Sequence, residues 1–366
     1  MKLLYITSDF SYNPGGIYQH IENLTFFASK NNQVVIIYLN QKKEITQIDE
    51  FGRKIYYLLN KGSQIERLYT YPLKKIESII DSEKADIIHN HTLFDSFKLK
   101  KTKEPFIFTN HSSSYLNMNS KYLMRKFVLP LVLKKFDLII APSTELFEKS
   151  NHKNKKMIPN GVNIDIFNIK NRIKYDKNEI LLKYKIENKF NRKIFLSTRR
   201  LADKNGILDF IKVNISYFKE NTEKIAYLII GNGEQFNEID SIIKKEKISN
   251  IYLLGEMKNE EIRQFYYISD FSIIPSKMEA ISISALESMA CGCIVLANKV
   301  GGLAELIQDH ENGIFIKELS LEKTLLNSNN EKLDIIKERA FNNIKNNYSW
   351  ETITNLTIKE YQKLTV

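Results

Sequence analysis

Residues 271–297, FSIIPSKMEAISISALESMACGCIVLA, combine a short apolar run, a stretch with helical spacing and a second apolar run. The pattern predicts a strand at Phe271–Pro275, a helix at Ser284–Ala290 that Gly292 ends, and a strand at Ile294–Ala297. Short, continuous apolar strands that alternate with helices are typical of parallel sheets covered by helices on both faces. The stretch therefore predicts an α/β fold.

The same alternation extends along the whole chain. Predicted strands of the first half are 3–7, 34–39, 55–58, 87–88, 106–109 and 138–141, and those of the second half are 194–198, 226–230, 251–254, 271–275, 294–297 and 313–316. Predicted helices are 16–30, 206–218, 235–246, 259–268, 284–290 and 349–366. Because a domain has about 100 to 200 residues, two such series in 366 residues predict two doubly wound, Rossmann-like domains.

We place the boundary between the predicted domains near residue 165. The turn signal Pro159-Asn160-Gly161 is followed by a polar segment without strand character that extends to Lys193. The sequence therefore predicts domains 1–165 and 166–348. From its pattern alone, the helix at 349–366 can cover the second sheet.

The composition excludes several classes of protein. Hydrophobic residues make up 43% of the chain and charged residues 27%, which excludes disordered, collagenous and coiled-coil proteins. No apolar run approaches the roughly 18 residues of a membrane-spanning helix, and the chain starts with an apolar strand in place of a secretory signal. The two cysteines, Cys291 and Cys293, are too few for a disulfide framework or a zinc quartet. We therefore expect a cytoplasmic protein and read both cysteines as small core residues.

Positive charge is concentrated in residues 98–156. The chain carries a net charge of +11, and this stretch alone has 13 basic residues against four acidic ones. Such a patch can attract phosphate-bearing polymers or the anionic inner leaflet of a membrane. An ordinary lysine-rich surface explains it equally well.

Ligands of open parallel sheets bind beyond the carboxyl ends of the strands, so two such domains predict a site in the cleft between them. After the first strand, Gly15 and Gly16 precede a helix, where backbone N–H groups favour an anion such as a phosphate. This is not a Walker A loop, because no Gly-Lys-Ser/Thr follows. The Gly231-Asn232-Gly233 segment is a weak dinucleotide-binding signal, because no third glycine follows at the required spacing.

Histidines stand at two other strand ends. His111 follows the strand at 106–109, where it can donate to a substrate hydroxyl or a developing charge. His89 and His91 follow the strand at 87–88 and suggest a metal site, but no cluster of carboxylates and histidines in the sequence completes one. Ordinary core or surface histidines are the alternative at all three positions.

Basic and acidic side chains follow two strands of the second half. Arg199 and Lys204, five residues apart across a strand-to-helix turn, can converge on one diphosphate. Glu279 lies in a loop after a strand, where a carboxylate can accept hydrogen bonds from sugar hydroxyls. Ser282 is a candidate N-cap with free N–H groups after it, and Glu287 can accept two vicinal ribose hydroxyls from the helix that follows. Solvated charges are the alternative for each residue alone.

Taken together, these residues resemble the retaining glycosyltransferases of family 4, whose GT-B fold has two facing Rossmann-like domains. The resemblance extends over the whole chain and rests on Pro14-Gly15-Gly16, Asp86-Ile87-Ile88-His89, Thr109-Asn110-His111, Ile158-Pro159-Asn160-Gly161-Val162-Asn163, Arg199-Arg200-Leu201, Lys204-Asn205-Gly206, Leu254-Gly255, the two glutamates of Glu279–Glu287, Met289-Ala290-Cys291-Gly292 and Gly301-Gly302. Each motif alone is weak, and their order and spacing together are specific.

The resemblance implies a role for each candidate residue. Arg199 and Lys204 would hold the diphosphate as it leaves, Glu279 would hold the donor sugar, and Glu287 would bind the ribose. His111 would contact the donor sugar near the reacting centre. The remaining implied donor-binding positions are Gly15 and Gly16 at the phosphates, the backbone of Ser282 and Ile283, and Gly255 to Met257 at the base. The final helix would pack back on the first domain, which receives the acceptor.

One departure concerns the sugar pocket. The family often has Gly-Phe-Gly after the first glutamate, where this chain has Ala280-Ile281-Ser282. The identity of the donor sugar is therefore open. No Asp-x-Asp motif occurs in the chain, which agrees with a fold that replaces a metal by basic side chains and helix dipoles, so we expect no metal and no cofactor.

The resemblance thus implies a hexosyltransferase that takes a nucleotide-diphosphate sugar, a UDP-sugar in our prediction, to a hydroxyl of a glycan or lipid-linked acceptor. Its usual setting is bacterial surface polysaccharide, such as capsule or lipopolysaccharide, made in the cytoplasm or at the inner face of the membrane. A GT-B nucleotide-sugar epimerase and a non-catalytic glycan- or nucleotide-binding relative are the alternatives. Nucleic acid is not an expected partner, because no recognised binding module is present.

Overall fold

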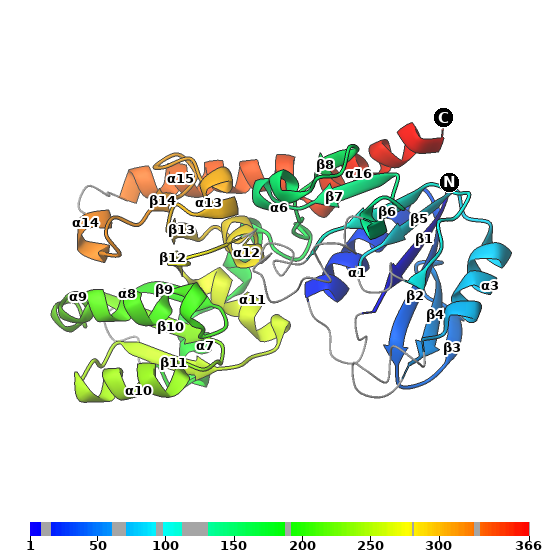
Figure 1. Ribbon diagram of the computed structural model, residues 1–366. Helices are drawn as coiled ribbons and strands as arrows, with labels where there is room; N and C mark the ends of the chain where they lie inside the picture. Colours follow the sequence, from blue (N-terminus) through cyan, green and yellow to red (C-terminus); the bar gives the residue numbers. More distant parts are fainter. Residues whose placement is uncertain are drawn as a thin grey trace. The chain divides into compact units, whose positions relative to one another are not determined.

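The structure is a computed structural model of the chain, and it describes residues 1–8, 16–60, 71–92, 98–111, 131–186, 192–279, 282–325 and 330–365. The chain divides into two compact units (Figure 1), the first formed by Met1–Gly161 with Trp350–Val366 and the second by Val162–Ser349. The division falls between Gly161 and Val162. The sequence analysis places this boundary near residue 165. The C-terminal segment belongs to the first unit.

The first unit contains an eight-stranded sheet with the strand order β3-β4-β2-β1-β5-β6-β7-β8. Its strands are β1 (Lys2–Thr7), β2 (Gln33–Gln41), β3 (Ile45–Ile48), β4 (Lys54–Leu59), β5 (Ile87–Asn90), β6 (Phe106–Thr109), β7 (Leu138–Ala141) and β8 (Lys155–Met157). The β3 strand runs antiparallel to β4 at one edge, and the other neighbouring pairs are parallel. The order changes direction at β1, which has β2 on one side and β5 on the other.

Helices cover both faces of this sheet. The described helices of the unit are α1 (Gly16–Ser29), α3 (Leu73–Glu83), α6 (Thr144–Lys149) and α16 (Trp350–Thr365). Alternate residues of β1 point to opposite faces, so Leu4 and Ile6 share a core with α3, whereas Leu3 and Tyr5 share a core with α1 and α16. The buried Tyr361 of α16 belongs to the second of these cores.

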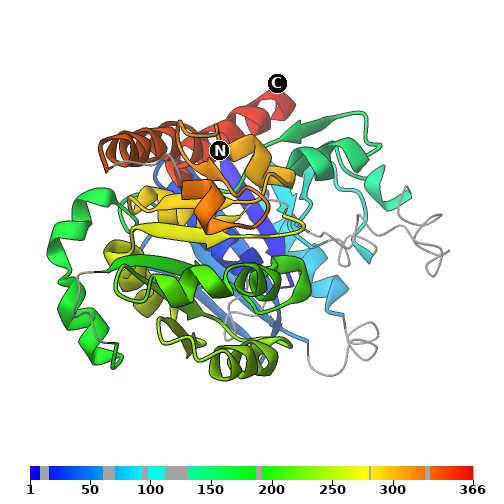
Figure 2. The same ribbon diagram turned by 90° about the vertical axis from the view of Figure 1, so that its left-hand side faces the viewer.

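The second unit contains a parallel six-stranded sheet with the order β11-β10-β9-β12-β13-β14. Its strands are β9 (Lys193–Thr198), β10 (Ile225–Ile230), β11 (Ile251–Gly255), β12 (Phe271–Ile274), β13 (Ile294–Ala297) and β14 (Ile314–Phe315). Its helices are η3 (Ile169–Lys174), α7 (Lys177–Lys183), η4 (Asp203–Asn205), α8 (Ile207–Val213), α9 (Ile215–Glu220), α10 (Phe236–Lys245), α11 (Asn259–Ile268), α12 (Ile283–Ala290), α13 (Gly301–Leu306), α14 (Leu321–Leu325), α15 (Asn330–Asn343) and η5 (Ile344–Tyr348). One core lies between the sheet and α8, α9 and α10, and two others pack α7 with α11 and α12 with α13 (Figures 1 and 2). The predicted α/β class with two parallel sheets is confirmed.

The predicted helix at 206–218 is wrong in one respect, because the structure divides it into α8 and α9 at Asn214. The Asn214 amide donates to the carbonyl oxygens of Phe210 and Leu319, and its side-chain oxygen accepts the Leu321 N–H at 2.8 Å. These bonds satisfy a buried polar side chain by joining the helix to a distant segment, and the periodicity of the helix does not reveal that segment. The sequence also missed β3, whose side chains are all exposed, and the short strand β8.

None of the helices in the described ranges is long and apolar enough to cross a membrane.

Candidate active site

The loops after β9 and β12 meet at the point where the strand order of the second sheet reverses. The chain runs from β9 outward to β10 and β11 and then returns to β12 on the other side of β9. In doubly wound sheets, ligands bind beyond the carboxyl ends of the strands at such a switch point. The backbone N–H of Lys277 donates to the Lys204 carbonyl at 2.9 Å and ties the two loops together.

Glycines allow these loops to approach closely. A Cβ on Gly206, whose φ is +70°, would overlap the carbonyl oxygen of Pro275, and a Cβ on Gly301 would overlap that of Glu279. Gly302 then donates its N–H to the Glu279 carbonyl at 3.1 Å. Glycine is therefore required at both crossings.

Three residues predicted separately come together in this region. The Arg199 guanidinium forms an ion pair with Glu279, and it also donates to Ser282 Oγ at 3.4 Å. Ser276 Oγ donates to the same Glu279 carboxylate oxygen at 3.4 Å. The side chains of Arg199 and Glu279 are 12% and 13% exposed, so the pair is shielded from water yet reachable from the surface. Removing one partner of such a largely buried ion pair is costly, because the other charge is left without compensation.

Ser282 caps the first turn of α12, as predicted. Its Oγ accepts the N–H of Ala285 at 3.3 Å, and its backbone is extended. Ile283 begins the helix and is 37% exposed. The helix N-terminus and the Arg199–Glu279 pair therefore lie at the same edge of the sheet. Ala280 and Ile281, where the chain departs from Gly-Phe-Gly, lie outside the described residues.

Lys204 lies in η4 and is exposed. The structure assigns its ammonium group no ion pair with any of the residues it describes. The neighbouring Lys277 is engaged instead, because its ammonium group contacts Asp203 and Asp209 at 2.7 Å each. These carboxylates raise the pKa of Lys277. Lys204 therefore stands beside the switch point as an exposed positive charge.

Glu287 lies on α12 and accepts a hydrogen bond from the Tyr266 hydroxyl at 3.1 Å. Tyr266 also bonds Thr198 at the end of β9, at 2.6 Å. Loss of hydration raises the pKa of Glu287 from 4.5 to about 7, against the opposing effect of the Tyr266 hydrogen bond. Glu287 therefore changes its charge near neutral pH.

The predicted base pocket follows β11. Gly255 has a φ of +72°, and its carbonyl accepts the N–H of Gly231 at 2.7 Å, which joins the ends of β10 and β11. Met257 is half-buried and packs against the core that contains α7 and α11. Cys291 and Cys293 are fully buried, as predicted for core residues, and the Cys293 thiol donates to the Tyr266 carbonyl at 3.0 Å.

In the first unit, the predicted anion site is described only in part. Gly15 lies outside the described residues, and Gly16 begins α1 in an exposed position with open space around it. Residues 112–130 of the basic stretch, with three of its bases, are also outside the description. Of the described bases, Lys101 pairs with Asp137 at 3.0 Å and Lys156 with Glu360 at 3.8 Å.

Four histidines of the first unit, His20, His89, His91 and His111, lie close together near the carboxyl edge of its sheet. His89 is saturated, since its two ring nitrogens contact Tyr361 Oη at 2.5 Å and Thr109 Oγ1 at 2.7 Å. His91 Nδ1 lies 3.0 Å from His111 Nε2. His20 of α1 joins them, with its ring centroid 4.6 Å from that of His111.

The imidazoles of His20, His89 and His91 are buried, and that of His111 is half-buried. Loss of hydration lowers the pKa of His20 to about 4 and lowers the pKa values of His89, His91 and His111 well below the ordinary value. Mutual repulsion of the rings acts in the same direction on the last three. All four are therefore neutral at pH 7.

Sequence reasoning missed His20 and Tyr266 as members of these sites. His20 stands between Ile17 and Ile21 on the buried face of α1, and a histidine on the apolar side of the helix after the first strand was the available signal. Tyr266 reads as an ordinary core residue of α11, and nothing in its spacing distinguishes it.

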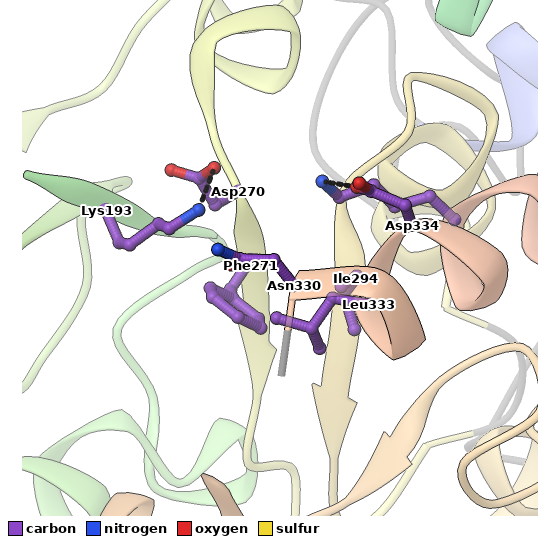
Figure 3. A pocket seen from close by; sticks show the side chains of 8 residues that line it. Lys193, Asp270, Phe271, Ile294, Asn330, Leu333 and Asp334 are labelled. Atoms are coloured by element: carbon purple, nitrogen blue, oxygen red, sulfur yellow. Dashed lines mark hydrogen bonds and ion pairs between the residues drawn. The ribbon is translucent and has the colours of Figure 1, made fainter. Parts of the chain in front are cut away.

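A separate cavity of about 210 Å³ lies at the opposite, amino-terminal edge of the second sheet (Figure 3). Lys193, Phe271 and Ile294, which line it, are the first residues of their strands. Its charged groups pair with one another, Lys193 with Asp270 at 3.7 Å and Lys337 with Asp334 at 2.9 Å. None of the predicted site residues within the described ranges lines this cavity.

Two family models match the chain. The model described as Glycosyl transferases group 1 matches residues 181–338, and the model described as Glycosyltransferase Family 4 matches residues 14–166. Together with the fold of two parallel-sheet units, these matches identify a GT-B glycosyltransferase. The two models together span most of the chain, which belongs to the glycosyltransferases of family 4.

Relatives and solved structures agree with this assignment. An uncharacterized glycosyltransferase of Methanocaldococcus jannaschii is 27% identical over 100% of this chain and 98% of its own length. The alpha-monoglucosyldiacylglycerol synthase of Acholeplasma laidlawii is 26% identical over 63% of each protein. Anabaena HepE, solved in complex with UDP and glucose, is 16% identical and has a TM-score of 0.74 over 100% of both chains. The sucrose-phosphate synthase of Thermosynechococcus elongatus is also 16% identical, with a TM-score of 0.76 over 99% of this chain and 98% of its own.

Proposed function

We propose that the protein is a retaining glycosyltransferase that moves a hexose from a UDP-sugar to a hydroxyl of a glycan or lipid-linked acceptor. The observation that carries this proposal is the grouping of Arg199, Glu279 and Ser282 at the switch point of the second sheet, beside the exposed charge of Lys204. A site with two cations, a carboxylate and a helix N-terminus suits a sugar diphosphate, which carries both negative charge and hydroxyl groups.

In this proposal, Arg199, Lys204 and the α12 N-terminus hold the diphosphate. The bond between the anomeric carbon and the diphosphate oxygen breaks, and the leaving group keeps the electron pair. A bond from the acceptor oxygen to the anomeric carbon forms on the same face, which retains the configuration, and the acceptor hydroxyl gives its proton to the leaving diphosphate oxygen. The positive groups act on the leaving charge as it develops, so this part of the site needs no metal.

Glu279 has two tasks in this account. Its ion pair with Arg199 fixes the guanidinium, and its second carboxylate oxygen is available to sugar hydroxyls. Glu287 binds the ribose hydroxyls as a carboxylate and loses acceptor strength when it is protonated. Gly255 to Met257 supply backbone groups for the base, and Gly15 and Gly16 supply N–H groups for phosphate. His111 is proposed to contact the donor sugar.

The choice of donor and acceptor rests on the relatives. HepE was solved with UDP and with UDP-glucose, which supports uridine as the base. The alpha-monoglucosyldiacylglycerol synthases and the human phosphatidylinositol N-acetylglucosaminyltransferase have lipid acceptors in their names, and a Salmonella relative is a lipopolysaccharide N-acetylglucosaminetransferase. We therefore propose a lipid-linked or glycan acceptor in bacterial surface polysaccharide synthesis, including capsule and lipopolysaccharide.

The basic stretch 98–156 is proposed to hold the enzyme on the inner face of the cell membrane. Cosedimentation with vesicles that contain phosphatidylglycerol is expected at low salt and is expected to fall as salt rises. Vesicles of phosphatidylcholine alone are the control. Equal sedimentation with both kinds of vesicle would contradict the electrostatic account.

The transfer reaction is tested by its stereochemistry. Proton NMR of the protein with UDP-glucose, and with water as the fallback acceptor, should show glucose released first with the anomeric configuration of the donor. Lys204→Ala should lose most of this turnover, whereas Lys212→Ala, an exposed lysine on α8, should not. Inverted glucose, or an unaffected Lys204→Ala variant, would contradict the proposal.

A further inference from the structure

The buried tyrosine of α11, Tyr266, links two parts of the second unit that the proposed function uses. Its hydroxyl oxygen lies 3.1 Å from Glu287 Oε2 and 2.6 Å from Thr198 Oγ1. Glu287 stands on α12, and Thr198 ends β9, one residue before Arg199. One side chain thus joins the position proposed for the ribose to the strand that carries the arginine proposed for the diphosphate.

The direction of these hydrogen bonds follows from the groups involved. A carboxylate oxygen can only accept a hydrogen bond, and a tyrosine hydroxyl has one hydrogen to donate. When Glu287 is ionised, Tyr266 therefore donates to its Oε2, and Thr198 donates to Tyr266. Within the described ranges, no residue bonds to the other carboxylate oxygen, Oε1, so its lone pairs are left for a ligand.

Packing holds the tyrosine in place. Tyr266 is 1% exposed and belongs to the core that contains both cysteines of the chain. The Cys293 thiol donates to the Tyr266 carbonyl at 3.0 Å, and the Phe167 ring lies edge-on to the tyrosine ring with 6.2 Å between their centroids. A hydrogen bond to a charged acceptor in such a shielded position is stronger than one between neutral groups. The hydroxyl is therefore fixed toward Glu287 by its surroundings.

We propose that Tyr266 is a positioning residue for the donor nucleotide. It holds the Glu287 carboxylate in the charged form and in the orientation that accept the ribose hydroxyls, and it ties that carboxylate to the end of β9. This inference rests on the proposed function, which assigns the ribose to Glu287. The next residue, Tyr267, is also buried, but its hydroxyl donates to the Ile166 carbonyl.

The proposed role has a consequence for the pH dependence of binding. Loss of hydration raises the pKa of Glu287 to about 7, and the Tyr266 hydrogen bond opposes this rise. Without the hydroxyl, the pKa of Glu287 should be higher still. The titratable groups that face Glu287 among the described residues are Tyr266 and Cys291, and loss of hydration raises both of their pKa values well above the ordinary ones. Both stay uncharged near neutral pH, so Glu287 is the group whose charge changes.

Two nucleotides that differ only in the ribose test this inference. Calorimetry between pH 6 and pH 8.5 gives the dissociation constants of UDP and of 2′,3′-dideoxyuridine diphosphate, which has the same base and the same phosphates. Their ratio therefore reports the contacts of the ribose hydroxyls. The wild type should prefer UDP, and the preference should rise with pH and level off above about 7. Tyr266→Phe should reduce the preference at pH 7 about 10-fold and move its rise to higher pH.

Two further variants complete the test. Tyr267→Phe removes one buried hydroxyl from the same helix and is the matched control, so it should leave the preference and its pH dependence as in the wild type. Thr198→Val keeps the shape of the side chain and removes the donor to Tyr266, so it should reduce the preference about 3-fold. This variant also serves if Tyr266→Phe does not fold, which circular dichroism checks.

Three outcomes would overturn the inference. In the first, Tyr266→Phe and Thr198→Val keep the full preference for UDP while Glu287→Gln makes it independent of pH, which would leave the ribose role of Glu287 standing without help from Tyr266. In the second, Tyr266→Phe weakens both nucleotides equally, so the tyrosine supports the fold alone. In the third, the wild type binds both nucleotides equally, which would also remove Glu287 from the ribose site. The stereochemistry of transfer is measured separately and does not depend on these ratios.

Discussion

The Glu287→Gln substitution should change how the stability of the second unit depends on pH. The folded protein raises the pKa of Glu287 from 4.5 to about 7. Folding therefore favours the protonated form, and the associated stability is complete below pH 4.5 and is lost as pH rises through 7. At about 1.36 kcal/mol per unit of pKa, the loss amounts to up to about 3 kcal/mol. Glutamine keeps the acceptor for the Tyr266 hydroxyl and removes the ionisation.

The assay is urea unfolding of both proteins between pH 5 and pH 8.5, followed by circular dichroism. The free energy of unfolding of Glu287→Gln minus that of the wild type should rise with pH up to about 7 and then level off. Glu223→Gln, an exposed glutamate of the same unit, is the control and should give a flat difference. A flat difference for Glu287→Gln as well would refute the assignment of its pKa to loss of hydration.

Three other substitutions have defined outcomes. Glu279→Ala leaves the Arg199 guanidinium half-buried without its partner, so it should abolish most turnover and also lower stability by up to about 3 kcal/mol, measured by urea unfolding. The double variant Arg199→Ala/Glu279→Ala should lose less free energy of unfolding than the two single variants added together. A loss equal to their sum would mean that the two side chains do not stabilise one another. Lys204→Ala removes an exposed cation, so it should cut turnover with a melting temperature within about 1 °C of the wild type; a large loss of stability would contradict the exposed position. Asn214→Ala removes three side-chain hydrogen bonds at the junction of α8 and α9 and should cost about 2 to 3 kcal/mol without changing donor binding.

Much of the fold could be predicted because the strands of both sheets are largely buried on both faces. The apolar runs at 106–109, 138–141 and 294–297 match β6, β7 and β13 residue for residue, and 259–268 matches α11. The edge strand β3 was not predicted from the sequence, because its four side chains are exposed and form no apolar pattern. The break at Asn214 was not predicted because two of its three hydrogen-bond partners, Leu319 and Leu321, lie more than 100 residues further along the chain.

The candidate site, like the fold, could be predicted only in part. Arg199, Glu279 and Ser282 could be predicted because parallel strands deliver the residues after them to one edge of the sheet. The direct pairing of Arg199 with Glu279 could not, since it depends on β9 and β12 being neighbours. The histidine cluster includes His20, which lies on α1 and is far from His91 and His111 in the sequence. Sequence spacing alone does not show that the three side chains are close in space.

Binding of a nucleotide diphosphate to the isolated protein tests the central claim most directly. Thermal shift against UDP, GDP, ADP and their common hexose conjugates, each with and without EDTA, should show a selective rise with the uridine compounds that EDTA leaves unchanged. Lys204→Ala should lose this rise, and Lys212→Ala should keep it. No rise with any nucleotide, or a rise that EDTA abolishes, would contradict a diphosphate site built from Arg199, Lys204 and the α12 N-terminus.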